Sequence, residues 1–496
     1  TQNVNSEGTS FSSPIMCLAM TASPSTFPYN EDGTFSTSFP ALNGANPLQT
    51  ATYNYDRSTI VRTLNTLSAT WNIWDNLNIK ETLGYDFNQT NNRVWWDPRS
   101  NDGRSSKGVF QRYMMNRSKL NTQTQLTYNK TFAEHHNIDV LLGFETEDYK
   151  YDYTYTNGNT YPSYLPEITN AGVSRGASNI NSYRMTSYLG RLNYDYAGKY
   201  LLEGNIRSDA SSRFADGNRW GYFPSFSAAW RISEEGFMEN TKDWLNNLKI
   251  RGSGGLLGNQ DALTDYYPWM NTYNLDASYP LGGALQSGYY QKAYKLSSIS
   301  WEKSRTWGLG FDATVNNKIN VTFDYYDRRT TGIIMDVPVP AEFGLDAYKD
   351  NVGEMSNRGV EVILSYNNKW GDWSFGATGN FSYNKNELLD LGLSPDAGGV
   401  TADPNNGNKV RKIGEALNTY RVYKADGFFE SDEAAQAWMD KYSTQAGYPF
   451  GTKKFKGGDL IYQDANGDGK MTADDRVLAG SSDPKFTFGL NLNAAY

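Results

Sequence analysis

The stretch YLGRLNYDYAGKYLLEGNIRSD, residues 188–209, decides the fold because its side chains alternate in character along two successive segments. From Tyr188 to Tyr196 every second residue is aromatic, leucine or glycine, and the residues between them are mostly polar. The same alternation returns from Tyr200 to Asp209, after the short connection Ala197-Gly198. Successive side chains of a β-strand point to opposite faces, so this pattern predicts two antiparallel strands joined by a tight turn.

The same alternation recurs along most of the chain and predicts thirteen strands. They cover residues 59–74, 77–89, 118–131, 136–155, 183–196, 199–210, 220–232, 246–258, 303–316, 318–331, 357–369, 372–386 and 484–496. Short connections such as Asp75-Asn76 alternate with long ones such as 90–117 and 259–302, and a helical turn is expected within 233–245. This alternation is typical of a membrane barrel, which has short turns on one rim and long loops on the other. The predicted fold class is therefore all-β, as part of a large antiparallel transmembrane β-barrel with long extracellular loops.

The composition suits a chain that meets both water and an apolar phase. It contains 36 tyrosines and 13 tryptophans, whose rings favour such boundaries. Mean hydropathy is −0.66, and no run of about 18 apolar residues predicts a membrane helix. The net charge of −8 excludes a basic footprint for nucleic acid, and the lone Cys17 excludes an internal disulfide framework. The chain opens at Thr1 without a signal peptide, so a mature chain or a fragment is expected.

The strand pattern also predicts a division of the chain and an orientation of its side chains. Four regions are expected: an extracellular loop region over 1–58, barrel strands with outer loops over 59–386, a long extracellular loop over 387–483 and a final strand over 484–496. Charge on a lipid-facing position costs ~2–4 kcal/mol at the bilayer midplane, so the charged face should be the inner one. Leu192, Ile206, Val321, Phe375 and Leu490 should then face lipid, and Asn193, Arg207, Thr322 and Asn380 should point inward.

Residues 464–475, DANGDGKMTADD, have the spacing of a calcium-binding loop. The expected ligands are the side chains of Asp464, Asn466, Asp468 and Asp475 and the carbonyl of Lys470, with Gly469 at the sharp turn. The twelfth position of such a loop normally holds glutamate, so the shorter aspartate must tighten the loop or recruit water. The stretch is therefore either a Ca²⁺ site that staples the long loop or a turn-rich loop without metal. A calcium sensor is not favoured, since the one nearby helix is expected at 432–442.

The sequence offers no catalytic pattern, so the chain is not expected to be an enzyme. His135 and His136 are adjacent, would point apart on a strand and are expected to be solvated at a short turn. Gly252-Ser-Gly254 begins a dinucleotide-binding pattern, but Leu257 occupies the place of its third glycine. Aromatic residues on the expected long loops could stack on sugar rings or pack locally, and they are Trp95, Trp96, Tyr266, Tyr267, Trp269, Tyr289 and Tyr290.

Several segments, in matching order over most of the chain, resemble the SusC/RagA group of TonB-dependent transporters. They are residues 188–202, 207–214 (RSDASSRF), 218–225, 229–235, 244–249, 258–260, 351–361, 458–459 with the calcium-like loop, and 483–489. The resemblance implies a 22-stranded barrel with a plug in its lumen. Thirteen strands without a plug would be an interior part of that protein.

The resemblance also implies a function. It implies TonB-dependent import of oligosaccharides or peptides across the outer membrane of a Gram-negative bacterium. The implied partners are membrane lipid, a SusD-like surface lipoprotein and a TonB complex reached through segments outside this chain. A dimer of transporter–lipoprotein pairs is one assembly that it allows. The alternative is a calcium-stabilised surface protein that binds glycans or adheres to them without transport.

Overall fold

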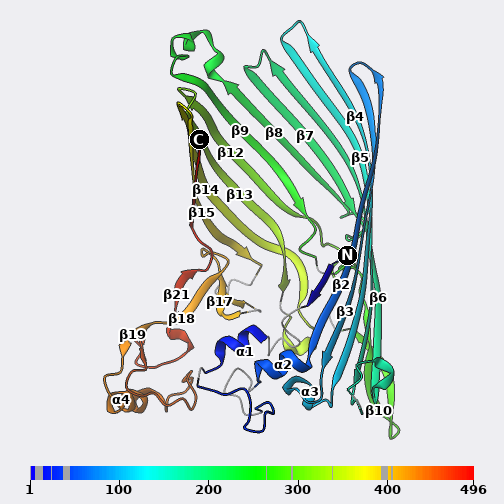
Figure 1. The fold of residues 1–496 in the computed structure, drawn as a ribbon, viewed down its shortest axis with the longest axis vertical. Helices are drawn as coiled ribbons and strands as arrows, with labels where there is room; N and C mark the ends of the chain where they lie inside the picture. Colours follow the sequence, from blue (N-terminus) through cyan, green and yellow to red (C-terminus); the bar gives the residue numbers. More distant parts are fainter. Residues whose placement is uncertain are drawn as a thin grey trace. The chain divides into compact units, whose positions relative to one another are not determined.

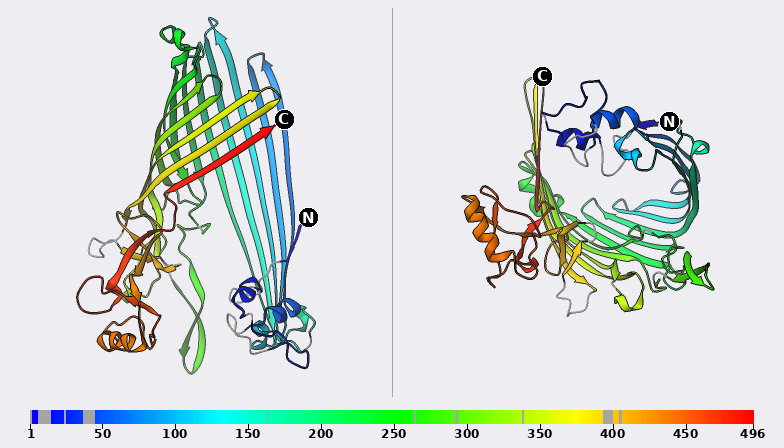
Figure 2. Two further views of the ribbon diagram at one scale, coloured as in Figure 1. Left: turned by 60° about the vertical axis from the view of Figure 1, so that its left-hand side comes forward. Right: turned by 90° about the horizontal axis from the view of Figure 1, so that it is seen from below.

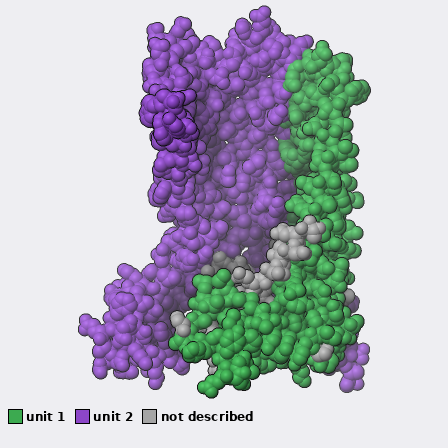
Figure 3. Space-filling view, viewed as in Figure 1, with its two compact units in different colours: residues 1–129, 140–190, 207–213 green, residues 130–139, 191–206, 214–496 purple. Residues whose placement is uncertain are grey.

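The computed structural model describes residues 2–5, 15–23, 25–36, 45–162, 164–263, 265–291, 294–337, 339–392, 400–403 and 406–496. The chain forms two compact units (Figure 3). Unit 1 comprises Thr1–Asn129, Val140–Gly190 and Arg207–Arg213, and unit 2 comprises Lys130–Asp139, Arg191–Ile206 and Phe214–Tyr496.

Among the described residues, fourteen strands form the largest sheet, in chain order (Figure 1). They are β1 (Gln2–Asn5), β2 (Tyr55–Trp74), β3 (Leu77–Trp96), β4 (Val109–Phe132), β5 (His136–Asn159), β6 (Val173–Tyr196), β7 (Tyr200–Ser211), β8 (Trp220–Arg231), β9 (Leu245–Asn259), β12 (Glu302–Val315), β13 (Ile319–Val337), β14 (Tyr348–Trp370), β15 (Trp373–Leu391) and β22 (Phe486–Ala495). All thirteen predicted strands are present, and several extend further than the alternation indicated. Alternation is lost where apolar residues follow one another at an extended end, as in Val94-Trp-Trp96.

The short connections are tight turns whose residues fit the backbone they need. Between β6 and β7, Ala197 and Gly198 take φ values of 55° and 68°, which match the twist of an antiparallel pair. The Asp195 carboxylate accepts the Gly198 N–H at 2.6 Å. Between β8 and β9 the expected helical turn appears as two 3₁₀ segments, Ile232–Glu234 and Gly236–Thr241.

Within each unit, turns and long connections lie at opposite ends of the strands (Figures 1 and 2). In unit 1 the turn at 75–76 lies at one end and the helices α1 (Ile15–Thr21), α2 (Pro47–Tyr53) and α3 (Asn101–Arg104) lie at the other. In unit 2 the turns at 316–318 and 371–372 lie opposite the smaller strands described next. We call these the turn end and the loop end of each unit.

Three regions predicted as loops contain regular structure instead. The 1–58 region carries two helices and the strand β1, whose residues Gln2–Asn5 pair with residues 57–60 of β2. Strand β2 itself begins within this region, at Tyr55. The 259–302 connection carries the hairpin of β10 (Tyr273–Leu281) and β11 (Ala284–Gln291). The 387–483 region carries β16 (Val400–Asp403), β17 (Asn406–Lys412), β18 (Thr419–Tyr423), β19 (Ala425–Phe428), α4 (Asp432–Tyr442), β20 (Leu460–Tyr462) and β21 (Arg476–Ser481). Residues 6–14, 37–44 and 393–399 of these predicted loops lie outside the described residues.

Helix α4 confirms the helix expected at 432–442 and organises its own small core. The Ser431 side chain caps its first turn by accepting the Ala434 N–H at 3.3 Å. Its buried side chains Ala435 and Met439 pack with Phe429 and Phe455. No helix in the described part of the chain is long and apolar enough to span a membrane.

Strand register separates two faces of the sheet in unit 2. One face carries four successive apolar rows, Leu309/Tyr325/Val360/Tyr383/Phe486, Phe311/Phe323/Val362/Phe381/Phe488, Ala313/Val321/Leu364/Gly379/Leu490 and Val315/Ile319/Tyr366/Ala377/Leu492. Rows are about 6.8 Å apart, so this apolar face spans about 20 Å of strand. The opposite, polar face carries Asp312, Thr322, Asp324, Glu361 and Asn380. The predicted separation of Val321, Phe375 and Leu490 from Thr322 and Asn380 is therefore confirmed.

Aromatic rings cross the turn end of unit 2 from strand to strand. Ring centroids are 4.9 Å apart for His136 and Tyr196, 6.1 Å for Tyr196 and Tyr200, and 6.4 Å for Tyr200 and Trp230. His136 also bonds the Tyr194 hydroxyl through Nδ1 at 2.8 Å. His135 is exposed, as expected, whereas His136 is half-buried, because the neighbouring strand supplies a ring and a hydroxyl that pack against it.

Candidate functional site

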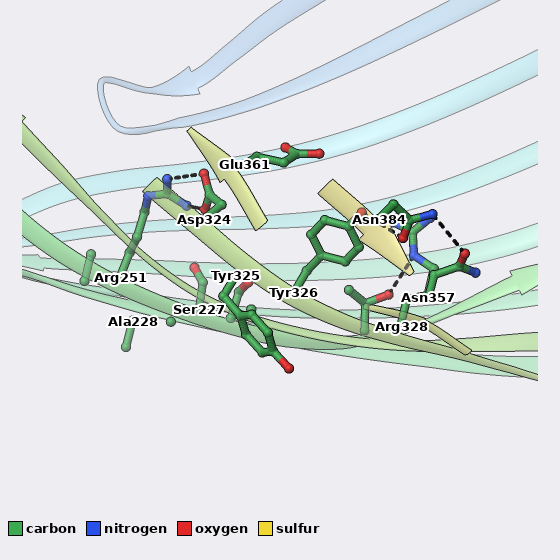
Figure 4. Close-up of a pocket in the computed structure, with 15 residues that line it drawn as sticks. Ser227, Ala228, Arg251, Asp324, Tyr325, Tyr326, Arg328, Asn357, Glu361 and Asn384 are labelled. Atoms are coloured by element: carbon green, nitrogen blue, oxygen red, sulfur yellow. Dashed lines mark hydrogen bonds and ion pairs between the residues drawn. The ribbon is translucent and has the colours of Figure 1, made fainter. Parts of the chain in front are cut away.

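A cavity of about 640 Å³ lies on the polar face of unit 2 (Figure 4). Its walls come from β8, β9 and β12–β15, and they include Ser227, Arg251, Ser253, Thr306, Asp324, Tyr326, Arg328, Asn357, Glu361 and Asn384. Figure 4 shows Tyr325 pointing away from this group while its neighbour Tyr326 points into it, as strand alternation requires. The cavity is therefore built from every second residue of several neighbouring strands.

An arginine crosses one strand to reach its partner in this cavity. Register places Arg251 of β9, Gly310 of β12 and Asp324 of β13 in one row. The Arg251 guanidinium binds both carboxylate oxygens of Asp324, with Nη2–Oδ2 at 2.7 Å. It also approaches Asp312, which Lys249 pairs with at 2.9 Å. Because Gly310 has no side chain, the guanidinium and the carboxylate can meet above it.

A tyrosine crosses a second glycine in the same way. Tyr326 of β13, Gly359 of β14 and Asn384 of β15 form one row. The Tyr326 hydroxyl donates to Asn384 Oδ1 at 3.2 Å, across Gly359. Asn357 Oδ1 then accepts from Asn386 Nδ2 at 2.9 Å. The cavity thus offers hydroxyl and amide groups beside the Arg251–Asp324 pair, an arrangement suited to hydrogen bonding a polar ligand.

These residues were not among those predicted for a site. Alternation alone placed Asp324 and Arg328 on the polar side of β13, which is the available signal. It could not pair Asp324 with Arg251, because that pairing depends on the register of three strands.

The polar face of unit 1 carries a network around Arg207. Its guanidinium contacts Glu145 Oε2 at 2.9 Å, Asp209 Oδ1 at 2.8 Å and Ser187 Oγ at 3.1 Å. A cavity of about 340 Å³ lies here, and Arg207, Ser187 and Glu145 help to line it. The predicted placement of Arg207 on the polar side is confirmed, since these partners share its face.

Tyrosines extend this polar face along β4–β6 in unit 1. Alternate positions of β5 hold Tyr149, Tyr151, Tyr153 and Tyr155, on the same strand face as Glu145. Centroids of Tyr113 and Tyr155 are 4.7 Å apart, and those of Tyr149 and Tyr183 are 5.0 Å apart. The Tyr183 hydroxyl donates to Glu147 at 2.6 Å. We call Tyr113, Tyr149, Tyr151, Tyr153, Tyr155 and Tyr183 the tyrosine row; it combines flat rings with hydroxyl groups on a polar wall.

At the loop end of unit 1, Arg99 lies between two rings and a carboxylate. Its guanidinium carbon is 4.1 Å from the centroid of the Tyr53 ring and 4.0 Å from that of Tyr164. Two bonds of 2.8 Å join it to the buried Asp97. Burial acts to raise the pKa of Asp97, but the side-chain and backbone hydrogen bonds from Arg99 outweigh it and lower that pKa. This cluster holds the loop after β3 in place.

The five predicted calcium ligands lie in one turn-rich loop, where the side-chain oxygens of Asp464, Asn466, Asp468 and Asp475 already accept backbone N–H groups. Asp464 accepts from Gly467 and Gly469, both at 2.8 Å. The fully buried Asp475 accepts from Ala465 at 2.9 Å and Thr472 at 2.7 Å. Further bonds run from Asp468 N–H to Asn466 and from Lys470 N–H to Asp468. Over the described residues, no group of three or more His, Cys, Asp or Glu side chains is gathered as a metal site.

The aromatic residues assigned to long loops have divided roles. Trp95 and Trp96 end β3, and Trp95 is buried against Phe110 and Tyr161, so the local-packing interpretation holds there. Tyr289 and Tyr290 lie on β11, and Tyr289 is 71% exposed. Tyr289 and Tyr290 are exposed and remain available to a partner, whereas Tyr266, Tyr267 and Trp269 are half-buried.

Comparison with known proteins gives a consistent relationship. Residues 19–496 match the family model for the TonB dependent receptor-like β-barrel. TonB-dependent receptor P39 of Formosa agariphila is 28% identical over 84% of this chain and 42% of its own length. TonB-dependent receptor SusC of Bacteroides thetaiotaomicron is 31% identical over 58% of this chain and 30% of its own length. The chain thus spans less than half the length of these curated relatives.

Solved structures show the same fold. The RagAB peptide transporter superposes with a TM-score of 0.75 at 22% identity, covering 94% of this chain and 50% of that one. The RagAB peptide importer in its open-open state gives a TM-score of 0.74 at 21% identity, covering 95% and 49%.

Proposed function

Because the chain belongs to the TonB dependent receptor-like β-barrel family, we propose that it forms part of the wall of an importer for oligosaccharides or peptides. Members of this family are outer-membrane β-barrel proteins of Gram-negative bacteria, and this chain has their fold and localisation. Family members are transporters and not enzymes. The matched relatives named SusC and RagAB support nutrient import as the activity.

The observation that carries the proposal is the chemistry of the polar faces. Several of their charges are paired, such as Arg251 with Asp324 and Arg207 with Glu145. Hydroxyl, amide and tyrosine groups lie beside these pairs. Such a wall suits a ligand with many hydrogen-bonding groups, and flat rings suit sugars or peptide side chains.

The proposal extends to partners that lie outside this chain. We propose that a SusD-like surface lipoprotein captures the ligand and that a TonB complex supplies the energy. The support is the match to SusC and to the RagAB transporter, which is itself a two-component assembly by name. A dimer of transporter–lipoprotein pairs is the assembly we propose for the whole protein.

Uptake by living cells tests the proposal. A strain lacking the gene would receive a mixed pool of neutral oligosaccharides and short peptides, and mass spectrometry would follow their depletion with and without a protonmotive-force uncoupler. We expect one ligand class to disappear only in complemented, energised cells. Surface retention without depletion, insensitive to the uncoupler, would favour the glycan-binding or adhesive alternative instead.

We also propose that Ca²⁺ binds at Asp464, Asn466, Asp468, Asp475 and the Lys470 carbonyl. The spacing of these residues supports this, and Gly467 and Gly469 take φ values of 72° and 78°, which permit the tight loop. The alternative is a loop closed only by the backbone bonds described above. Calcium titration of the intact protein, followed by protease protection of residues 460–480, separates them. Asp464→Ala should loosen the loop and leave the barrel folded; protection that calcium never changes would remove the proposal.

A further inference from the structure

The apolar face of unit 2 carries an unassigned groove over a glycine floor. Register places Phe226 of β8, Gly254 of β9 and Trp307 of β12 in one row. A cavity of about 550 Å³ lies here, with an almost wholly apolar lining that also includes Pro224 and Leu256. Phe226 is 67% exposed and Trp307 is 40% exposed. Gly254, the second glycine of the dinucleotide-like pattern in the sequence, thus lies on the floor of an apolar groove, and Gly255 also lines it.

Charged rows begin on this same face where the apolar rows end, toward the loop end. Moving from Leu309 along β12, the next residues on this face are Trp307, Arg305 and Lys303. The three rows that contain them are Trp307/Asp327/Arg358/Lys385, Arg305/Arg329/Ser356/Glu387 and Lys303/Thr331/Glu354/Asp390. They hold five basic and four acidic side chains, and both charged residues on β12 are basic, so the excess of positive charge lies at the β12 side of the boundary, beside the groove.

Three of the four acidic side chains of these rows are paired with a basic one, and the fourth, Asp390, lies on β15, three strands away from Lys303 along its row. Asp327 pairs with Arg358 at 2.8 Å, Glu387 pairs with Lys385 at 2.8 Å, and Glu354 pairs with Arg329. Lys303 and Arg305 are exposed, and within the described residues no ion pair joins either to a carboxylate. Arg305 also lines the groove itself. Two unneutralised cations therefore stand at the charged end of an apolar groove.

We propose that this groove binds a phosphorylated, acylated glycolipid of the outer leaflet. An acyl chain would lie on the floor between Phe226 and Trp307, and a phosphate would face Arg305 and Lys303. The groove opens on the face turned to lipid, so its occupant must itself reside in the membrane. In outer-membrane barrels the long loops are extracellular, which places the charged end of the groove at the outer leaflet. Basic residues at a membrane surface attract anionic head groups in the same way.

The charge arm of the test compares Lys303→Gln/Arg305→Gln with Lys318→Gln in the intact protein. Lys318 is an exposed lysine at the turn end of the same β12–β13 hairpin, so the control removes like charge at the opposite boundary. Native mass spectrometry in mild detergent would measure binding of bisphosphorylated lipid A. We expect the double variant to bind roughly 30-fold more weakly and the control to match the wild type. Equal binding by all three proteins would overturn the proposal.

Two further arms test the acyl chain and the source of the phosphate. Trp307→Ala should weaken lipid A binding several-fold, whereas Trp370→Ala, at the turn end, should leave it unchanged. If both variants lose binding, or neither does, the acyl chain does not bind between Phe226 and Trp307. Dephosphorylated lipid A should bind the wild type as weakly as lipid A binds the double variant. If phosphatidylglycerol binds as tightly as lipid A, the assignment to a glycolipid is wrong. Because binding is measured without transport, failure here leaves the import proposal standing.

Discussion

Replacing Gly310 with alanine should weaken the sheet at the polar cavity much more than the same change at Gly204, where a Cβ has open space. A Cβ at this position would lie 2.5 Å from the Phe323 carbonyl oxygen and 2.6 Å from Asp324 Oδ1. It would also lie 3.1 Å from Arg251 Cζ. The first of these neighbours is backbone of the paired strand, so it cannot move aside without disturbing the ladder. Either β12 and β13 must separate slightly, or the Arg251–Asp324 pair must open.

The size of the effect follows from these contacts. Overpacking of this kind costs about 1–3 kcal/mol. A hydrogen bond to a charged group is worth about 1.5–3 kcal/mol when buried, but these side chains are about one-third exposed, so about 1 kcal/mol is appropriate. Alanine itself gains up to about 1 kcal/mol over glycine in a strand. We therefore expect Gly310→Ala to lower the free energy of unfolding by roughly 1–3 kcal/mol.

Gly204→Ala is the matched control, because a Cβ on Gly204 in strand β7 would meet no atom within 4 Å. Denaturant unfolding of the intact protein in detergent, followed by tryptophan fluorescence, would compare the two. Repeating Gly310→Ala in an Arg251→Gln background should reduce its cost, since no guanidinium then has to move. If the free energies of unfolding of Gly310→Ala and Gly204→Ala differ by less than about 0.5 kcal/mol, the argument that the Arg251–Asp324 pair closes tightly over Gly310 is refuted.

Three further predictions use the same reasoning. Gly359→Ala should lower the free energy of unfolding by roughly 1–3 kcal/mol in the same assay, because its Cβ would clash with the Tyr383 carbonyl oxygen of the paired strand and would lie 2.5 Å from the Tyr326 hydroxyl oxygen; an unchanged stability would contradict the close packing of Tyr326 over Gly359. Because the pKa of Asp97 is lowered in the folded protein, the stability that its carboxylate contributes to the fold is fully present above the unfolded pKa near 3.8. That stability is lost as pH falls through the lower, folded pKa. Hydrogen exchange of residues 97–108 should therefore accelerate below pH 4 in the wild type, and Asp97→Asn should remove that acceleration. Asp475→Ala should expose residues 464–475 to protease with or without calcium, whereas Asp474→Ala, at an exposed neighbour, should not; equal protection would show that Asp475 does not close the loop.

The sequence predicted the strands well because each strand has one apolar and one polar face. Alternation located all thirteen, and it placed Leu490 and Arg207 on the correct kind of face. It failed where alternation is not the organising rule. β1 is only four residues long, and its existence depends on pairing with β2 at Ile60. In the 387–483 region, α4 was found from its own pattern, but the strands around it are three to seven residues long and pair with distant segments.

The site was harder to predict than the fold because its contacts depend on register across three strands. Arg251 and Asp324 are 73 residues apart in the chain, and they meet only because Gly310 occupies the position between them. A shift of one residue in either strand pair would turn one partner to the apolar face. A sequence shows which residues share a face, but it does not show which of them share a row.

The effect of a glycine at the centre of a row depends on the residues that flank it in that row, and these differ between the polar and the apolar face. On the polar face, Gly310 is flanked by residues with opposite charge, so their side chains close over it. On the apolar face, Gly254 is flanked by Phe226 and Trp307, which have no hydrogen bond to make across the gap. Their rings border an open floor, and that floor can accept an acyl chain. The same substitution to alanine should therefore break a bridge at Gly310 but only fill a groove at Gly254, where the nearest atom to a new Cβ is a movable Phe226 ring carbon at 3.2 Å.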